Sequence, residues 1–307
     1  MTSIPFISFE SGEKLLDWVA LTDAFAQGHT RPKAEIGDTF LYRDPDTLLS
    51  RAAWIDGMGM AVKSATVFPR NAAKGMPNIN GGVSLYSDAD GTLEAIIDFH
   101  LVTKWKTAGD SLLAARRLAR KDASHILLVG AGTVARSLHA AYSSVFPNAS
   151  FTVWSRTQST AHSMAESVPN LRVAADLENA VTQADIIATA TMTTEPLIKG
   201  EWLHPGQHLD LIGAYRPDMR EVDDEALKRA RVFVDSFDTT LGHIGEIKTP
   251  LETGAITREH IIADFYNLDA FTRRSDEEIT ICKNGGGAHL DLMTSRYILD
   301  QWRRAAF

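Results

Sequence analysis

The chain has 307 residues, of which 44% are hydrophobic and 23% charged, with a formal net charge of −8 at pH 7. The composition excludes a disordered chain or a small disulfide-stabilised peptide, and the length predicts about two domains. The negative charge gives no global attraction to nucleic acid or to an anionic membrane. Residues 1–10 show no secretory-signal pattern, no apolar stretch approaches a membrane span, and Cys282 is the only cysteine. We therefore expect a cytoplasmic protein with neither a nucleic-acid nor a membrane partner.

The N-terminal part of the chain predicts a mixed α+β region. Apolar residues at helical spacing between Gly12 and Gln27 predict an amphipathic helix. Two β-prone runs flank Asp90-Gly91 within residues 81–98 and predict an antiparallel hairpin. A segment rich in Ala, Leu and Arg predicts a helix between Lys104 and Lys121.

After Lys121, short apolar runs alternate with helical patterns, which predicts βαβ units and a parallel sheet. The expected strands are HILLVG, FTVW, LRVA, DIIATA, HLDLIG and RVFVDS. Helices are expected from about Gln158, from about Leu177 and in EVDDEALKRA. The last stretch, from about Gly286, predicts a helix that is long enough to return to the first region.

The run ILLVGAGTVA places a G-x-G-x-x-A turn directly after an apolar strand and directly before a helix. Gly130 permits the tight turn, and Gly132 lets the backbone approach a pyrophosphate that faces the helix N-terminus. We therefore predict that Gly130, Gly132, Thr133 and Val134 bind a dinucleotide. A glycine turn in a nucleotide-free α/β domain is the alternative interpretation.

The end of the second predicted strand indicates which dinucleotide is bound. It carries Ser155, Arg156 and Thr157 where an NAD-binding domain has a carboxylate. A guanidinium between two hydroxyl groups suits the 2′-phosphate of NADPH. If Arg156 instead stacks on the adenine, NADH also serves. The run from Ala190 to Thr193, which contains Thr191 and Met192, follows the DIIATA strand and is expected to lie alongside the cofactor.

Seven segments in order resemble the ornithine cyclodeaminase/mu-crystallin family, which includes bacterial ketimine reductases. They are AVKSATVFP, NAAKGMPNINGGVSLY, TKWKTAGDS, VGAGTVA, IGAYRPDMREVDDE, VFVDS and KNGGGAHLD. The resemblance implies an α/β protein in which a Rossmann-type doubly wound parallel sheet domain, residues 119–286, is inserted in an α+β domain. That second domain, residues 1–118 plus 287–307, is expected to bind the substrate and to form a homodimer.

The resemblance also assigns substrate residues. Lys63 of AVKSATVFP is expected at the substrate, as a carboxylate ligand or proton donor; a surface lysine is the alternative. Lys106 replaces the family's carboxylate-binding arginine, and Arg51 is a candidate for the missing bidentate fork, or else a structural arginine. Asp291 resembles the family residue that reaches the reaction centre from the last helix. Thr107 is expected to contact the cofactor phosphates or the substrate.

One departure from the family bears on the reaction. Tyr215 stands where cyclodeaminases carry an aspartate, and we interpret Asp218 as structural. This favours reduction of a preformed cyclic imino acid over cyclisation of ornithine. The WKTAGDS run resembles reductases that convert 1-pyrroline-2-carboxylate to L-proline in hydroxyproline breakdown, with 1-piperideine-2-carboxylate, the precursor of L-pipecolate, as a second substrate.

Two other functions stay open from the sequence. One is an ornithine cyclodeaminase or alanine dehydrogenase-like enzyme of the same family. The other is a non-catalytic, mu-crystallin-like ligand-binding protein. No group of His, Asp or Glu residues shows metal-ligand spacing, so we expect no catalytic metal.

Overall fold

A computed structural model describes residues 4–305 of the chain. The chain divides into two compact units. The first contains the N-terminal part through Lys106 together with the segment from Gly287, and the second is Thr107–Gly286. The domain boundaries expected from the sequence, with a Rossmann-type domain over residues 119–286, remain a prediction. Among the described residues, no helix is both long enough and apolar enough to cross a membrane.

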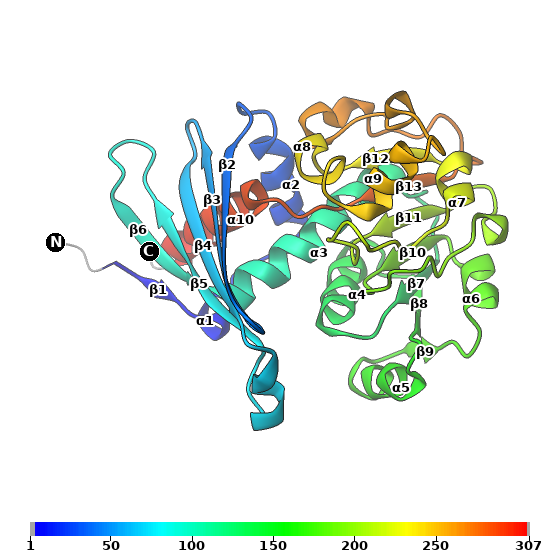
Figure 1. The fold of residues 1–307 in the computed structure, drawn as a ribbon, viewed down its shortest axis with the longest axis horizontal. Helices are drawn as coiled ribbons and strands as arrows, with labels where there is room; N and C mark the ends of the chain where they lie inside the picture. Colours follow the sequence, from blue (N-terminus) through cyan, green and yellow to red (C-terminus); the bar gives the residue numbers. More distant parts are fainter. Residues whose placement is uncertain (1–3, 306–307) are drawn as a thin grey trace. The chain divides into compact units, whose positions relative to one another are not determined.

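The first unit contains a six-stranded sheet and helices that pack on one of its faces (Figure 1). Its strands are β1 (Phe6–Ile7), β2 (Glu35–Arg43), β3 (Asp46–Ile55), β4 (Gly59–Val67), β5 (Ile79–Tyr86) and β6 (Leu93–Asp98). Its helices are α1 (Phe9–Glu13), α2 (Trp18–Gly28), the start of α3 (Phe99–Leu118) and α10 (Ala288–Ala305). The strand order is β1-β6-β5-β4-β3-β2, and α10 packs against β3, β4, β5 and α2.

The predicted hairpin is confirmed, because β5 and β6 pair antiparallel and Gly91 in their turn has a φ of 70°. The single helix expected over residues 12–27 is wrong. The chain forms α1 and α2 with a break between them, and Asp17 caps α2 by accepting a hydrogen bond from the Ala20 N–H at 2.8 Å. A side-chain acceptor at this position favours a new helix start over continuation of the first helix. The strands β2 and β3 were not singled out in the sequence.

Strand alternation decides which residues of this sheet face α10. In β4 the buried positions are Gly59, Ala61, Lys63 and Ala65, whereas the residues between them are more exposed. Side chains along a strand alternate between the two faces of a sheet, so Lys63 lies on the helix-covered face. A lysine on the buried face of a sheet requires partners for its charge.

The second unit contains a seven-stranded, fully parallel sheet (Figure 1). Its strands are β7 (His125–Val129), β8 (Ser150–Trp154), β9 (Leu171–Val173), β10 (Ile186–Thr189), β11 (His208–Leu211), β12 (Arg231–Val234) and β13 (Thr280–Lys283). Its helices are α4 (Thr133–Val145), α5 (Gln158–Ser167), α6 (Leu177–Gln183), α7 (Asp224–Arg229), α8 (Phe237–Thr240) and α9 (Gly245–Glu252). All six predicted strands of this region are present.

The strand order of this sheet is β12-β13-β11-β10-β7-β8-β9. The chain moves outward in one direction from β7 to β9 and then returns to β10 on the other side of β7. This reversal creates the switch point at which open α/β sheets bind ligands, outside the carboxyl ends of the strands. The sequence did not predict β13, which inserts between β11 and β12. The parallel sheet confirms the expected Rossmann-type fold.

Candidate active site

Lys63, Lys106 and Asp291 meet in the first unit, although they come from β4, α3 and α10. The Lys63 ammonium donates to Asp291 Oδ1 at 2.9 Å, and the Lys106 Nζ lies 3.8 Å from the same oxygen. All three residues are buried, with exposed fractions of 7%, 7% and 1%. The fold therefore places two ammonium groups around one carboxylate in a site largely removed from water.

The charges in this group depend on one another. Burial alone would raise the pKa of the Asp291 carboxyl, but the ammonium groups of Lys106 and Lys63 outweigh burial and lower this pKa below its ordinary value. Asp291 is thus ionised at neutral pH. Its second oxygen, Oδ2, is buried and makes no hydrogen bond to any residue between 4 and 305. The Lys63 ammonium also lies 4.7 Å from the centre of the Phe99 ring, a cation–π contact.

Arg51 lies on the same face of the sheet as Lys63. It is directly opposite Lys63 in the β3–β4 pairing, and it is opposite Asp38 in the β2–β3 pairing. Its Nε donates to both Asp38 carboxylate oxygens at 3.1 Å, and its Nη2 donates to Oδ2 at 3.0 Å. Its role as a substrate fork stays a prediction.

Two histidines beside this group were not singled out in the sequence. His289 precedes Asp291 by two residues at the start of α10, and its ring lies 5.4 Å from that of His29 in an edge-to-face arrangement. Burial lowers the pKa of His289 well below its ordinary value, and the neighbouring His29 imidazole and Lys106 ammonium lower it further. Burial likewise lowers the pKa of His29 to about 4. Both imidazoles are neutral at neutral pH, so they add no positive charge to the two lysines.

The second unit contains a cavity of about 430 Å³ at the switch point of its sheet. Seven predicted cofactor residues line it: Gly130, Gly132, Ser155, Arg156, Thr157, Thr191 and Met192. Ala190 and Thr193, from the run expected to lie alongside the cofactor, also line it, as do Ala131, Trp154, Thr160 and Leu197. The predicted residues Thr133, Val134 and Thr107 do not line this cavity. Thr133 and Val134 begin α4, and Thr107 is half-buried within α3.

The glycines of this cavity fit a dinucleotide. Gly130 has a φ of 113°, and a Cβ there would lie 2.7 Å from the Ala190 carbonyl oxygen, so a side chain is excluded. At Gly132 a Cβ would meet no atom within 4 Å, which leaves open space next to the first residue of α4. Backbone N–H groups at a helix N-terminus favour a phosphate in such a space.

Just after β8, Arg156 lines this cavity, is exposed and forms no hydrogen bond or ion pair within the described chain. Thr160 donates a hydrogen bond to the Ser155 hydroxyl at 3.0 Å and fixes its position. An exposed guanidinium with no partner among the described residues, next to hydroxyl groups, suits the binding of a phosphate ester.

Tyr215 and Asp218 lie in the second unit, in the loop after β11. The Tyr215 side chain is 57% exposed. Asp218 accepts two hydrogen bonds from the Arg216 guanidinium, at 2.8 and 2.9 Å, and this interaction lowers the pKa of the Asp218 carboxyl. Asp218 is therefore an exposed, ionised partner of Arg216.

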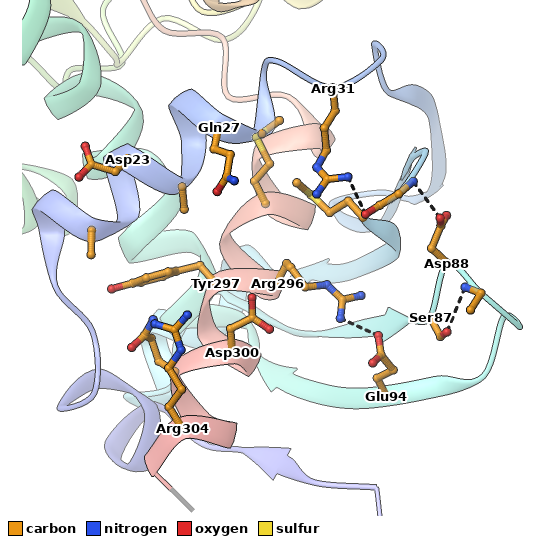
Figure 2. Close-up of a pocket in the computed structure, with 18 residues that line it drawn as sticks. Asp23, Gln27, Arg31, Ser87, Asp88, Glu94, Arg296, Tyr297, Asp300 and Arg304 are labelled. Carbon is orange, nitrogen blue, oxygen red and sulfur yellow. Dashed lines mark hydrogen bonds and ion pairs between the residues drawn. The ribbon is translucent and has the colours of Figure 1, made fainter. Parts of the chain in front are cut away.

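A larger cavity of about 640 Å³ lies in the first unit between α2 and α10 (Figure 2). Its α10 side is formed partly by Tyr297, Asp300 and Arg304, and Figure 2 shows these side chains pointing toward it. Helical spacing of about 100° per residue puts them on the opposite side of α10 from Asp291. The larger cavity is thus separate from the buried charges of the candidate site.

Comparison with known proteins identifies the family. The profile of the ornithine cyclodeaminase/mu-crystallin family matches residues 53–306. The Delta(1)-pyrroline-2-carboxylate reductase of Paracoccus denitrificans is 48% identical over 301 residues, 95% of each chain. An archaeal alanine dehydrogenase dimer with bound NAD superposes with a TM-score of 0.88, at 26% identity over 99% of this chain and 97% of that one.

A third protein shares the fold at lower identity. The Delta(1)-pyrroline-2-carboxylate reductase of Thermococcus litoralis, solved with NADH and L-proline, gives a TM-score of 0.88 at 24% identity, with 98% of each chain covered. The extent of the family match and the identity to the Paracoccus reductase agree with the motifs found along the sequence. This chain belongs to the ornithine cyclodeaminase/mu-crystallin family.

Proposed function

We propose that this protein is an NAD(P)H-dependent reductase that converts 1-pyrroline-2-carboxylate to L-proline. The observation that carries the proposal is the buried group of Lys63, Lys106 and Asp291, together with 48% identity to a reductase of that name. A cyclic imino acid carries one carboxylate and, when protonated, one positive nitrogen. Two ammonium groups and one carboxylate complement both of these charges. We also expect turnover of 1-piperideine-2-carboxylate, because one extra methylene is weakly discriminated.

Within this group, different residues bind the substrate carboxylate and the protonated ring nitrogen. The two ammonium groups bind the substrate carboxylate, and Asp291 Oδ2, which has no partner within the described chain, accepts the N–H of the protonated ring nitrogen. This placement separates the iminium from the lysines and reduces their repulsion. Protonation makes C2 more electrophilic, and as hydride adds there the electron pair of the C=N bond moves to nitrogen. One of the two lysine ammonium groups supplies this proton.

NAD(P)H, when bound, supplies the hydride, and the cavity at Gly130 and Gly132 is where we place it. We propose that NADPH is preferred over NADH. The support is Arg156, an exposed guanidinium with no partner in the described chain, at the end of β8 where an NAD-selective domain needs a carboxylate. The neighbouring Ser155 and Thr157 add hydroxyl donors for a phosphate.

Cyclisation of ornithine is the less suitable reaction for this chain. It requires an acid or base for the amine and water steps, and Tyr215 occupies the position at which the family's cyclodeaminases have an aspartate. The nearest carboxylate in that loop, Asp218, is exposed and bound to Arg216. We therefore expect no release of ammonia from ornithine.

The first unit also offers a surface for dimer formation, and we propose a homodimer. The face of the sheet turned away from α10 carries exposed apolar side chains on β1, β2, β3 and β6. They are Phe6, Leu41, Leu48, Trp54 and Ile96, which are 38–62% exposed. An apolar sheet face of this kind is typical of an interface, and a second copy supplies an identical face.

The deciding experiment follows the loss of NADPH absorbance with 1-pyrroline-2-carboxylate, identifies the proline enantiomer formed, and assays ornithine in parallel for ammonia. We expect L-proline and no ammonia. NADPH binding without reduction of either cyclic imine would instead favour a ligand-binding protein. Ammonia from ornithine would restore the cyclodeaminase.

A further inference from the structure

One buried carboxylate in the second unit accepts hydrogen bonds from two separate loops. Glu221 is 1% exposed. Its Oε1 accepts from the Thr191 N–H at 2.8 Å and from the Thr191 hydroxyl at 2.6 Å. Its Oε2 accepts from the N–H groups of Gly213 and Ala214 at 2.7 and 3.3 Å. The loops that follow β10 and β11 are therefore tied to the same side chain.

These two loops lie in close contact with each other. A Cβ at Gly213 would lie 2.0 Å from the Thr191 carbonyl oxygen and 2.3 Å from its nitrogen. On the other side, Ala190 leaves no room for a side chain at Gly130, and its N–H donates to the Val129 carbonyl at 2.8 Å. The Gly130 turn, the Thr191 loop and the Gly213 loop are thus three neighbouring layers, and the first two line the candidate cofactor cavity.

The backbone of Glu221 is itself bound by a second buried carboxylate. The Glu246 carboxylate, fully buried in the first turn of α9, accepts from the Glu221 N–H at 2.6 Å and from the Val222 N–H at 3.1 Å. A small apolar cluster of Ala214, Met219 and Ile244 packs the same loop against the start of α9. The backbone that carries Glu221 is therefore also held by α9.

We propose that Glu221 is the positioning residue of the cofactor site, which sets the backbone of Thr191 and Gly213 for dinucleotide binding. It does not line the cavity and acts through the loops that it holds. A preorganised loop loses less conformational entropy on binding, so the carboxylate increases cofactor affinity without touching the cofactor. This inference rests on the proposed NAD(P)H-dependent function.

The test replaces the carboxylate by an amide of the same shape. In Glu221→Gln, either orientation of the amide sets its NH2 group against a backbone N–H, of Thr191 or of Gly213, and releases that loop. We expect the Kd for NADPH, measured by direct titration, to rise about 10- to 100-fold. The value of kcat at saturating NADPH should stay within about threefold, because the lysines and Asp291 are unchanged.

Asp185→Asn is the matched control. Asp185 also accepts two backbone N–H groups, of Ser124 and His125 at 2.8 and 3.0 Å, but at the amino end of the same sheet. We expect it to lower the melting temperature and leave the NADPH Kd unchanged. Thr191→Val removes only the hydroxyl donor and should raise the Kd about two- to fivefold; it provides the answer if Glu221→Gln does not fold.

The outcomes separate this inference from the proposed function. Wild-type protein that binds neither NADPH nor NADH would overturn both. Wild-type binding with an unchanged Kd in Glu221→Gln, or in Thr191→Val if the first variant is unfolded, would overturn the positioning role alone. Equal loss of affinity in Glu221→Gln and Asp185→Asn would also overturn it, because a general loss of structure then accounts for the effect.

Discussion

Charge balance around Asp291 determines what the candidate substrate site accepts. Lys63 and Lys106 both face one carboxylate, and His289 and His29 are neutral beside them. The group therefore has a net positive charge and attracts an anionic substrate. A buried charge is stable only with such partners, so removing any member leaves the others with an uncompensated charge.

Lys63 provides the sharpest test at the residue scale. In Lys63→Ala, we expect NADPH to bind as in the wild type, since the cofactor residues are unchanged, and imine reduction to fall by about 100-fold or more. Lys104→Ala is the control, because Lys104 pairs with Glu13 at a partly exposed position of α3. Steady-state kinetics with both variants measures the difference. Normal reduction by Lys63→Ala would remove Lys63 from the mechanism.

Arg156 gives a second test, which concerns the cofactor. In Arg156→Ala, the KM for NADPH should rise about 10- to 100-fold, because a charge-assisted contact to phosphate is lost, while the KM for NADH stays nearly constant. The neighbouring Thr160→Ala variant controls for disturbance of the Ser155 hydroxyl, with which Thr160 forms a hydrogen bond. Equal changes with NADPH and NADH would contradict recognition of the 2′-phosphate.

At this scale, the sequence identified charged residues by motif but not their contacts. Lys63, Lys106 and Asp291 were each predicted, whereas the shared Asp291 oxygen depends on how β4, α3 and α10 pack. Glu221 stood in a recognised motif and was not singled out, because its hydrogen bonds with Thr191, Gly213 and Ala214 depend on how the loops fold together. Tertiary hydrogen bonds of this kind leave no periodic signal in a sequence.

At the scale of elements, short apolar runs that alternate with helical patterns predicted the strands of the second unit well. The points at which a helix or strand ends were predicted poorly. The strands from β7 to β12 follow apolar runs bounded by turns, and all of them form. β13 was missed because its apolar run ends in the charged Lys283, whereas β10, β11 and β12, which are equally short, end in uncharged residues. That lysine is buried because its ammonium donates to the carbonyl oxygens of Leu211 and Asn284 at 2.7 and 2.8 Å.

The break between α1 and α2 yields a prediction about one element. Asp17→Ala removes the side-chain acceptor for the Ala20 N–H and should lower the free energy of unfolding by about 1 kcal/mol. Gln27→Ala, an exposed change in the last turn of α2, is the control. Urea titration measures both. A loss equal to that of the control would show that Asp17 does not start the helix.

For the whole molecule, buried titratable groups set how stability depends on pH. The folded-state pKa of His29, about 4, is below its ordinary value, so the unfolded chain binds a proton first as the pH falls. Its stabilising contribution is complete above about pH 6.5 and is lost progressively toward pH 4. Glu246 acts oppositely: burial and the neighbouring Glu221 raise its pKa to about 7, so its contribution is lost as the pH rises through about 4.5 to 7.

We expect His29→Gln to reduce the loss of unfolding free energy between about pH 7.5 and 5 by about 2 kcal/mol, because glutamine does not titrate. His162→Gln is a close control. Both histidines place Nδ1 at 2.8 Å from the carbonyl oxygen four residues earlier, but His162 is exposed on α5. Urea unfolding at the two pH values compares them. An unchanged pH dependence in His29→Gln would exclude His29 as the source.

The apolar outer face of the first unit's sheet gives a test of the proposed homodimer. Leu41 and Leu48 are directly opposite each other on β2 and β3, and Phe6 and Ile96 form a similar pair on β1 and β6. In a dimer, Leu41→Glu places a charge in an apolar interface, whereas in a monomer it replaces a side chain that is 61% exposed. We therefore expect light scattering to give a dimer for the wild type and for Thr182→Glu, an exposed change on α6, and a monomer for Leu41→Glu. A wild-type protein that stays monomeric at micromolar concentration would contradict the homodimer and leave this face to another partner.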